Sequence, residues 1–221
     1  MIITIDGPAG SGKSTVARKL AAILEFPYLD TGAMYRAIAY TALQNSTDLS
    51  DERALLALAG SMDLDLDCGP THTRVRVNGH DVSEAIRSMA VSAATLPVAK
   101  NAGIRALLVD RQRQIGKKLG SLVSEGRDQG SVVFPQADVK FVLEASLETR
   151  ADRRCQELEA DGEDADRSIV MENLAARDRS DAKQWEPLLS SGAATVIDTT
   201  EMKTVEVVDR LAAIVRGYSV R

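Results

Sequence analysis

Short apolar runs alternate along the chain with stretches in which apolar residues recur every three or four positions. The apolar, often β-branched runs predict strands at 1–6, 27–30, 122–125, 139–144 and 194–198. The stretches of helical periodicity predict helices at 13–24, 34–44, 102–118, 147–160, 168–177 and 204–216. Strands that alternate with helices pair in parallel through right-handed crossovers. The pattern therefore predicts an α/β fold around a parallel sheet.

One stretch interrupts this alternation. Met62, Leu64 and Leu66 alternate with aspartates, which is the pattern of a half-exposed strand. A second strand-like run at 74–77 leads into Asn-Gly, a pair that favours a type I′ hairpin turn. We therefore expect a small sheet of short strands at 62–83, inserted between the second and third strands of the main sheet.

Directly after the first predicted strand, the chain reads Gly-x-x-x-x-Gly-Lys-Ser from Gly7 to Ser14. Because a helix follows, the backbone N–H groups of this loop and the helix dipole point at one place. The arrangement predicts a phosphate-binding loop, in which Lys13 reaches the β- and γ-phosphates of a nucleotide and the Ser14 hydroxyl binds Mg²⁺. The alternative is a glycine-rich turn with a chance lysine and serine. The residues expected at the nucleotide phosphates are Gly7, Gly10, Ser11, Gly12, Lys13, Ser14 and Thr15.

The composition narrows the class of protein. The chain has 221 residues, of which 44% are hydrophobic, and this suits one α/β domain with a full core. No apolar run approaches the ~18 residues of a membrane span. The formal net charge of −5 argues against a general nucleic-acid binder. Cys68 and Cys155 lack metal-ligand spacing and are expected to be reduced thiols. These features predict a cytoplasmic protein without nucleic-acid or membrane partners.

Two polar motifs follow predicted strands, at the sheet edge where ligands of such folds bind. The first, Asp-Thr-Gly-Ala-Met-Tyr-Arg at 30–36, offers Thr31 as a helix cap and phosphate donor, and Arg36 as a forked phosphate ligand. The second, Glu-Gly-Arg-Asp-Gln-Gly, offers Arg127 to neutralise phosphate and Asp128 to accept hydrogen bonds from a base amino group. The alternatives are a helix start with a solvated arginine, and a surface turn with a weak ion pair.

Arg150, Arg153 and Arg154 share one face of the helix predicted at 147–160. Arginines that close over a phosphoryl group stabilise its charge during transfer and exclude water. Acidic residues stand nearby in the same helix, so the spacing also fits a salt-bridged surface. Taken by itself, the spacing favours that second interpretation.

Together with the phosphate loop, four longer motifs resemble those of the bacterial cytidylate kinases, which are P-loop nucleoside monophosphate kinases. These motifs are Asp-Thr-Gly-Ala-Met-Tyr-Arg, Asn-Gly-His-Asp-Val-Ser-Glu-Ala-Ile-Arg, Glu-Gly-Arg-Asp-Gln-Gly-Ser-Val-Val-Phe-Pro and Arg-Asp-Arg-Ser-Asp. The resemblance runs from Ile2 to about Thr200. It implies a P-loop NTPase-like fold with a five-stranded parallel sheet flanked by helices, a small mixed-sheet insertion that binds the nucleoside monophosphate, and a helical lid. It implies one kinase domain at 1–221, with a core at 1–61 and 119–221, the insertion at 62–118 and the lid at 150–182.

The resemblance also implies the reaction, which is transfer of the γ-phosphoryl group of ATP to CMP or dCMP with Mg²⁺, in pyrimidine nucleotide metabolism. ATP and CMP or dCMP are the expected partners of a protein that acts as a monomer. Lys13, Arg127, Arg150, Arg153 and Arg154 are then the expected catalytic residues.

The family's contacts to CMP carry over residue by residue. Thr31, Arg36 and Arg127 would hold the phosphate. Arg105 and Asp128 would hold the base, and Arg177 and Asp181 the sugar. Leu96 and Gln184 depart from the family pattern near the expected cytosine site, where a serine and an arginine are common.

Two alternatives to this reaction stay open. One is a P-loop kinase acting on UMP, AMP or an alcohol; an alcohol would need a carboxylate base, for which Asp30 or Asp128 could serve. The other is a nucleotide-dependent switch, although the Asn-Lys-x-Asp motif typical of such switches does not occur in the sequence. A phosphate-monoester acceptor is already ionised at neutral pH, so its site needs mainly positive charge and alignment. We expect the lid and the insertion to close when both substrates bind.

Overall fold

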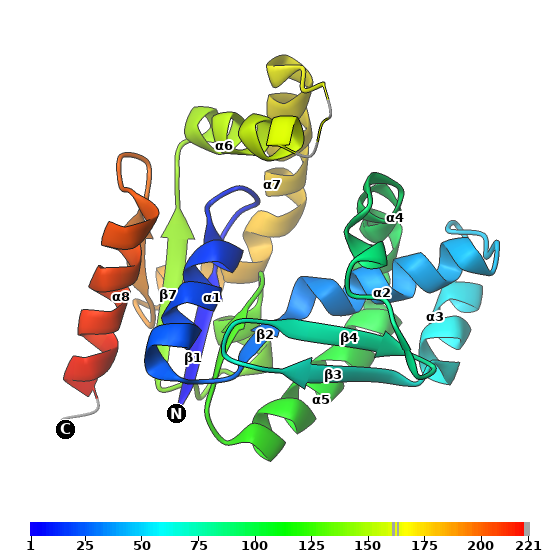
Figure 1. Cartoon of the computed structure of the whole chain (residues 1–221), viewed down its shortest axis with the longest axis horizontal. Coiled ribbons are helices and arrows are strands. Elements are labelled where there is room, and N and C mark those ends of the chain that lie inside the picture. The colour runs from blue at the N-terminus through cyan, green and yellow to red at the C-terminus, as the bar shows by residue number, and fades with distance from the viewer. Residues whose placement is uncertain (161, 163, 219–221) are drawn as a thin grey trace.

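A five-stranded parallel sheet forms the centre of the computed structural model (Figure 1). The structure describes residues 1–218 apart from 161 and 163, and it leaves out the side chains of 180–183 and 185. All five strands pair in parallel in the order β2-β6-β1-β7-β8. They are β1 (Ile2–Asp6), β2 (Tyr28–Asp30), β6 (Leu122–Glu125), β7 (Val139–Glu144) and β8 (Thr195–Asp198). The α/β class and the five-stranded parallel sheet are therefore confirmed.

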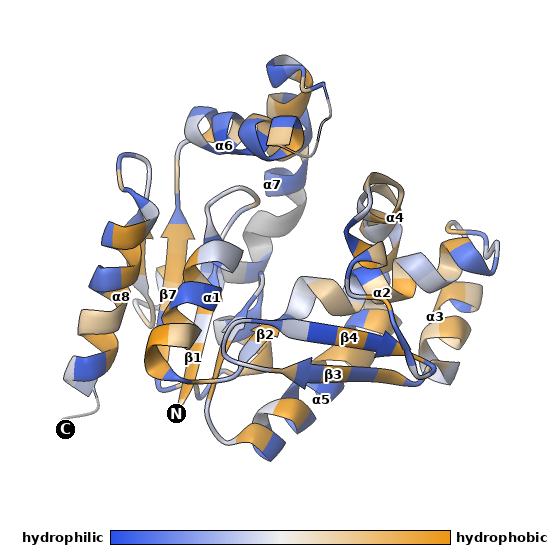
Figure 2. Ribbon diagram, in the orientation of Figure 1, coloured by the Kyte–Doolittle hydropathy of each residue, from blue (hydrophilic) through white to orange (hydrophobic). Residues whose placement is uncertain are grey.

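Helices cover both faces of this sheet. One face packs against α1 (Lys13–Leu24) and α8 (Thr204–Tyr218), the other against α5 (Ala102–Leu119) and the end of α7 (Arg167–Ser190). Figure 2 shows β7 as mostly orange, and its Phe141 is fully buried. Strands of a parallel sheet are covered on both faces, which explains why they read in the sequence as continuous apolar runs.

A smaller sheet lies beside the main one, in the order β3-β4-β5. Its strands are β3 (Leu64–Cys68), β4 (Thr73–Val77) and β5 (His80–Asp81). Asn78 and Gly79 both have positive φ, 50° and 81°, as a type I′ turn requires. Both pairings are antiparallel, so the sheet that was expected to be mixed is antiparallel. Short connections between successive strands permit only that pairing.

The small sheet shares one hydrophobic core with the helices around it. These are α2 (Thr31–Gln44), α3 (Glu52–Ser61), the short 3₁₀ turn η1 (Ala85–Arg87), α4 (Met89–Lys100) and the first half of α5. Helices α3 and α4 are absent from the sequence prediction. The cap of α3 is Asp51, whose carboxylate accepts hydrogen bonds from the backbone N–H groups of Arg53 and Ala54. Helix α4 carries Pro97 in its interior, a residue that argues against a helix when the sequence is read alone.

Helices α6 (Leu147–Ala160) and α7 form a hairpin above the carboxyl end of the sheet (Figure 1). Ala151, Leu158 and Leu174 pack with Ala9 of the phosphate loop in one buried cluster. The prediction that α7 ends at 177 is wrong: the helix continues to Ser190, with Pro187 in its last turn. In the described part of the chain, no helix is long and apolar enough to span a membrane.

Candidate active site

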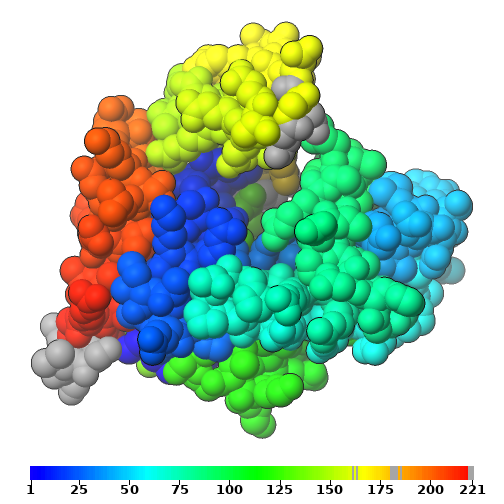
Figure 3. All heavy atoms as spheres, in the orientation of Figure 1, coloured from blue at the N-terminus to red at the C-terminus, as the bar shows by residue number. Residues whose placement is uncertain are grey.

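A cleft of about 380 Å³ opens at the carboxyl end of the parallel strands. Figure 3 shows the hollow between the blue N-terminal segment, the yellow helices of the α6–α7 hairpin and the teal and green segments of the smaller sheet and the helices around it. The cleft brings together most of the residues predicted for the site, although they are far apart in the sequence. Its lining includes Gly10, Gly12, Lys13, Ser14, Thr15, Thr31, Arg36, Arg105, Arg127, Asp128, Arg154 and Arg177.

The loop between β1 and α1 has the backbone shape that its glycines were expected to allow. Gly7 has a φ of 136°, and a Cβ atom there would lie 2.1 Å from the carbonyl oxygen of Leu143. Only glycine fits such a close approach of two backbones. Ser11 is buried, and its hydroxyl donates to the carbonyl of Pro8 at 3.0 Å. The Lys13 ammonium donates to the same carbonyl at 2.5 Å, which keeps its charge at the mouth of the loop.

The sheet register places three carboxylates at this edge. Both Ile5, at the end of β1, and Asp30, at the end of β2, pair with Glu125 of β6. Asp6 follows Ile5 directly. Asp6, Asp30 and Glu125 are all at least 95% buried. Burial raises the pKa of Asp6 to about 6 and also raises the pKa of Glu125.

Glu125 lies against the residue expected to bind the metal. Its carboxylate accepts hydrogen bonds from the Ser14 hydroxyl at 2.8 Å and from the Tyr28 hydroxyl at 3.2 Å. A serine hydroxyl and a carboxylate are the hard oxygen ligands that Mg²⁺ prefers, so this pair fits the ion. Among the described residues there is no group of three or more His, Cys, Asp or Glu side chains that could hold a metal. The sequence prediction named Ser14 and missed Glu125.

The motif after β2 supplies a cationic group opposite the phosphate loop. Arg36 donates through Nη2 to Asp30 Oδ2 at 2.7 Å, and Arg87 from η1 approaches the same oxygen at 3.4 Å. The other oxygen of Asp30 caps α2 by accepting from Ala33 N at 3.0 Å, so the expectation that Thr31 caps this helix is wrong. The carboxylate that might have been a base for an alcohol is therefore engaged. In the described part of the chain, Arg36 Nε is buried without a hydrogen-bond partner, which leaves a cationic donor available to an anion.

The far end of the cleft carries the predicted base contacts. Arg105 Nη2 donates to Asp128 Oδ2 at 2.7 Å, and Asp128 is only 6% exposed. Helix α4 faces them with Ser92 and Thr95, which line the cleft. The expectation that Leu96 stands at the base is wrong. Leu96 is 46% exposed and lies outside the lining, because one further residue along a helix turns the side chain by about 100°.

Two residues of α7, Arg177 and Asp181, are the predicted sugar contacts. Arg177 of α7 lines the cleft, whereas the side chain of Asp181 lies outside the described residues. Gln184, one turn further, also lines the cleft, and its backbone carbonyl accepts from the Ser131 hydroxyl at 2.7 Å.

The three arginines of α6 point to three different places. Arg150 is buried and binds the Asp178 carboxylate at 2.7 and 3.1 Å, as well as the carbonyl of Ala9 in the phosphate loop at 3.1 Å. Arg153 donates to the carbonyl of Thr199 at 2.6 Å. Only Arg154 of the three lines the cleft. A shared helix face thus does not bring the three guanidinium groups to one site.

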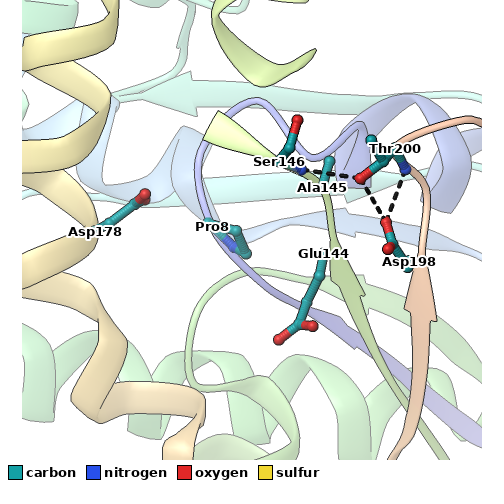
Figure 4. A pocket seen from close by; sticks show the side chains of 7 residues that line it. All are labelled: Pro8, Glu144, Ala145, Ser146, Asp178, Asp198 and Thr200. Atoms are coloured by element: carbon teal, nitrogen blue, oxygen red, sulfur yellow. Dashed lines mark hydrogen bonds between the residues drawn. The ribbon is translucent and has the colours of Figure 1, made fainter. Parts of the chain in front are cut away.

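A second hollow, of about 400 Å³, is lined in part by Pro8 of the phosphate loop (Figure 4). Asp178 borders it from α7, while Asp198 and Thr200 border it from the end of β8. The carboxylate of Asp198 accepts from the backbone N–H of Thr200 at 2.9 Å and from its hydroxyl at 2.6 Å. Glu144 adds a third carboxylate to a lining that contains no basic residue. This acidic hollow is unsuited to phosphate, so the arginine-lined cleft is the candidate active site.

Comparison with known proteins places the chain in a family. The family model for cytidylate kinase matches residues 3–217. The cytidylate kinase of Bacillus velezensis is 44% identical over 218 residues, which are 98% of this chain and 97% of that protein. The cytidylate kinase of Geobacillus thermodenitrificans is 45% identical over 214 residues, 96% of this chain and 95% of that protein.

Solved structures show the same fold at low sequence identity. The protein TT1252 from Thermus thermophilus is 21% identical with a TM-score of 0.50, and 98% of this chain and 96% of that one are covered. A shikimate kinase from Bacteroides thetaiotaomicron is 12% identical with a TM-score of 0.50, covering 98% of both chains. With the family model and these curated relatives spanning nearly its whole length, the chain belongs to the cytidylate kinase family.

Proposed function

We propose that the chain transfers the γ-phosphoryl group of ATP to CMP and dCMP in an Mg²⁺-assisted reaction. The observation that carries this proposal is that two separate cationic groups face one cleft. Lys13 in the phosphate loop is one, and Arg36 with Arg127 is the other. A nucleotide switch needs only the first, whereas a kinase that joins two anionic substrates needs both.

On the donor side, the loop 7–14 and Lys13 would hold the phosphates of ATP. Ser14 and Glu125 would hold Mg²⁺, which when bound neutralises charge on those phosphates. Tyr28 donates to Glu125 and so fixes the orientation of the carboxylate that faces Ser14.

On the acceptor side, Arg36 and Arg127 would hold the phosphate of CMP. Arg36 contributes the buried Nε that no described residue occupies. A phosphate-monoester oxygen is already ionised, so no general base is needed. Asp128 and Arg105 would read the cytosine, because a carboxylate accepts the hydrogen bond that an exocyclic amino group donates.

Arg154 is the lid arginine best placed to reach the transferring group, since it lines the cleft. Arg150 and Arg153 would contribute from outside it, by holding the α6–α7 hairpin to the phosphate loop and to the segment after β8. Closure of this hairpin would exclude water, which otherwise competes with CMP for the phosphoryl group. In this proposal the protein is a monomeric, cytoplasmic enzyme that acts in pyrimidine nucleotide metabolism.

The test is steady-state ADP release with ATP and Mg²⁺, offering CMP, dCMP, UMP, AMP and shikimate in turn. We expect turnover with CMP and dCMP to exceed turnover with each of the others by at least about tenfold. Arg36→Met should lose most of the CMP-dependent rate, whereas Arg18→Met, which changes an exposed arginine of α1, should keep it. ATP binding without turnover of any acceptor would favour the switch instead.

A further inference from the structure

A buried network of uncharged side chains stands directly behind the expected base contacts. Gln129 begins the π-helical turn η2 (Gln129–Val133) and is 1% exposed. Its neighbours Gln112 of α5 and Ser124 of β6 are 1% and 0% exposed. Among the described residues that line the cleft, none of these three is found, but Gln129 donates to Asp128, which does line it.

Both the oxygen and the nitrogen of the Gln129 amide are engaged in hydrogen bonds. Its Oε1 accepts from the Ser124 hydroxyl at 2.7 Å. Its Nε2 donates to Gln112 Oε1 at 3.0 Å and to Asp128 Oδ1 at 3.3 Å. Turning the amide over would set its oxygen against the carboxylate of Asp128, so only one orientation satisfies the network. The side chain therefore has a single arrangement.

The backbone of the same residue is fixed as firmly. Asp6 accepts from the N–H groups of Gln129 and Gly130 at 2.7 and 2.8 Å, which ties this turn to the strand that leads into the phosphate loop. Gly126 gives the amide its room, since a Cβ atom there would lie 2.9 Å from Gln129 Nε2. The position of the amide is thus set from three directions.

Asp128 is consequently held at both oxygens. Arg105 binds Oδ2 from the cleft side, and Gln129 binds Oδ1 from behind. N–H donors on both sides favour the ionised, accepting form of a carboxylate over its protonated form. Such a carboxylate can accept from the amino group of cytosine, but it has no proton to give to the corresponding carbonyl of uracil.

We propose that Gln129 is a positioning residue for base discrimination: its amide orients Asp128 and preserves it as an acceptor, so that cytosine is preferred over uracil. This inference rests on the proposed CMP kinase activity. Gln129 itself has no contact with substrate in this role.

Burial and the neighbouring groups act on the pKa of Asp128 in opposite directions, and burial has the larger effect. Burial raises the pKa of Asp128, while Arg105, the Gln129 amide and Arg127 lower it. Asp6 is a second carboxyl nearby, and its pKa is raised to about 6 by burial. Tyr35 stays neutral, because burial raises its pKa to about 12. Loss of the Gln129 donor therefore moves Asp128 toward the protonated form.

The test is Gln129→Met, which keeps the length of the side chain and removes its donors and its acceptor. We expect kcat/KM for CMP to fall by about tenfold or more, mainly through KM for CMP, with KM for ATP changed less than about twofold. The preference for CMP over UMP should shrink, and shrink further at about pH 6 than at about pH 8, because a protonated Asp128 can donate to uracil. A merely structural role would lower both substrates' rates together and leave that preference unchanged.

Two further variants keep the result interpretable. Val132→Ala changes a 43% exposed residue in the same turn and should leave the preference as in the wild type. Ser124→Ala removes one anchor of the Gln129 amide and should shift the preference in the same direction by a smaller factor, even if Gln129→Met does not fold. If both Gln129→Met and Ser124→Ala keep the wild-type preference for CMP over UMP, the inference about Gln129 is wrong, while the proposed kinase activity still stands. Failure of the wild type to bind CMP in calorimetry overturns the inference and the proposed function together.

Discussion

Replacing Arg150 with methionine should loosen the junction between the phosphate loop and the α6–α7 hairpin. The Arg150 side chain is only 7% exposed and makes two charge-assisted hydrogen bonds to Asp178, at 2.7 and 3.1 Å. It also donates to the carbonyls of Ala9 and Ala145, at 3.1 and 3.0 Å. Methionine fills much of the same space and can make none of these bonds.

The expected loss in the free energy of unfolding follows from how far the side chains of Arg150 and Asp178 are exposed to water. Removing one member of a fully buried pair costs about 3–5 kcal/mol, because the other charge is left unpaired. Asp178 is 27% exposed and can recover water, so we expect a loss of about 2–4 kcal/mol in the free energy of unfolding. The coupling between the two side chains should be about 1–2 kcal/mol.

Urea unfolding of the wild type, Arg150→Met, Asp178→Asn and the double variant measures that coupling, provided that the m-value is unchanged. The reasoning is refuted if Arg150→Met unfolds at the same urea concentration as the wild type and the coupling stays below about 0.5 kcal/mol. If kcat then still falls steeply, Arg150 leaves Asp178 during the reaction and acts on the substrate.

Three further outcomes are expected. Burial raises the pKa of Asp6 to about 6, so its contribution to stability is complete below its ordinary pKa of 3.8 and is lost as the pH rises through 6. Relative to Asp6→Asn, the wild type's free energy of unfolding should therefore fall by about 2 kcal/mol between about pH 4 and about pH 7; a rise would contradict this sign. Ser14→Ala should raise the Mg²⁺ concentration for half-maximal rate by about tenfold or more, and an unchanged dependence would remove Ser14 from the metal site. Arg36→Met should raise KM for CMP by about 30-fold while leaving KM for ATP nearly unchanged; an equal rise in both would place Arg36 elsewhere.

The parts predictable from sequence are those with a strong local signal. The strands of the parallel sheet are covered on both faces, so β6 and β7 have the bounds that their apolar runs predicted, and β1 begins one residue later than its run. The phosphate loop carries its own glycines, and its conformation follows from them. Helix α3 carried a local signal that the prediction overlooked, since Asp51 caps it and its buried Leu55 and Ala59 are four residues apart. Helix α4 gave a weaker signal, because its apolar residues are not confined to one face and Pro97 lies inside it.

The residues of the site could be predicted only where they belong to a recognisable sequence motif. Lys13, Arg36 and Arg105 reach the cleft as expected. The partners that decide what a charge does come from elsewhere in the chain. Asp178, which engages Arg150, lies a full helix away in the sequence, and Glu125 meets Ser14 only because β6 is next to β1. Helical spacing predicted the three arginines of α6 on one face. In the structure, Arg150 binds Asp178, Arg153 binds Thr199 and Arg154 lines the cleft.

The most direct test of the central claim is CMP-dependent formation of ADP by the wild-type protein with ATP and Mg²⁺. We predict that ADP appears at the full rate only when CMP or dCMP is present, with one CDP or dCDP formed for each ADP released. Release of ADP at the same rate without any acceptor, or tight ATP binding with no CDP formed, would contradict the claim that the second cationic group in the cleft holds an acceptor phosphate.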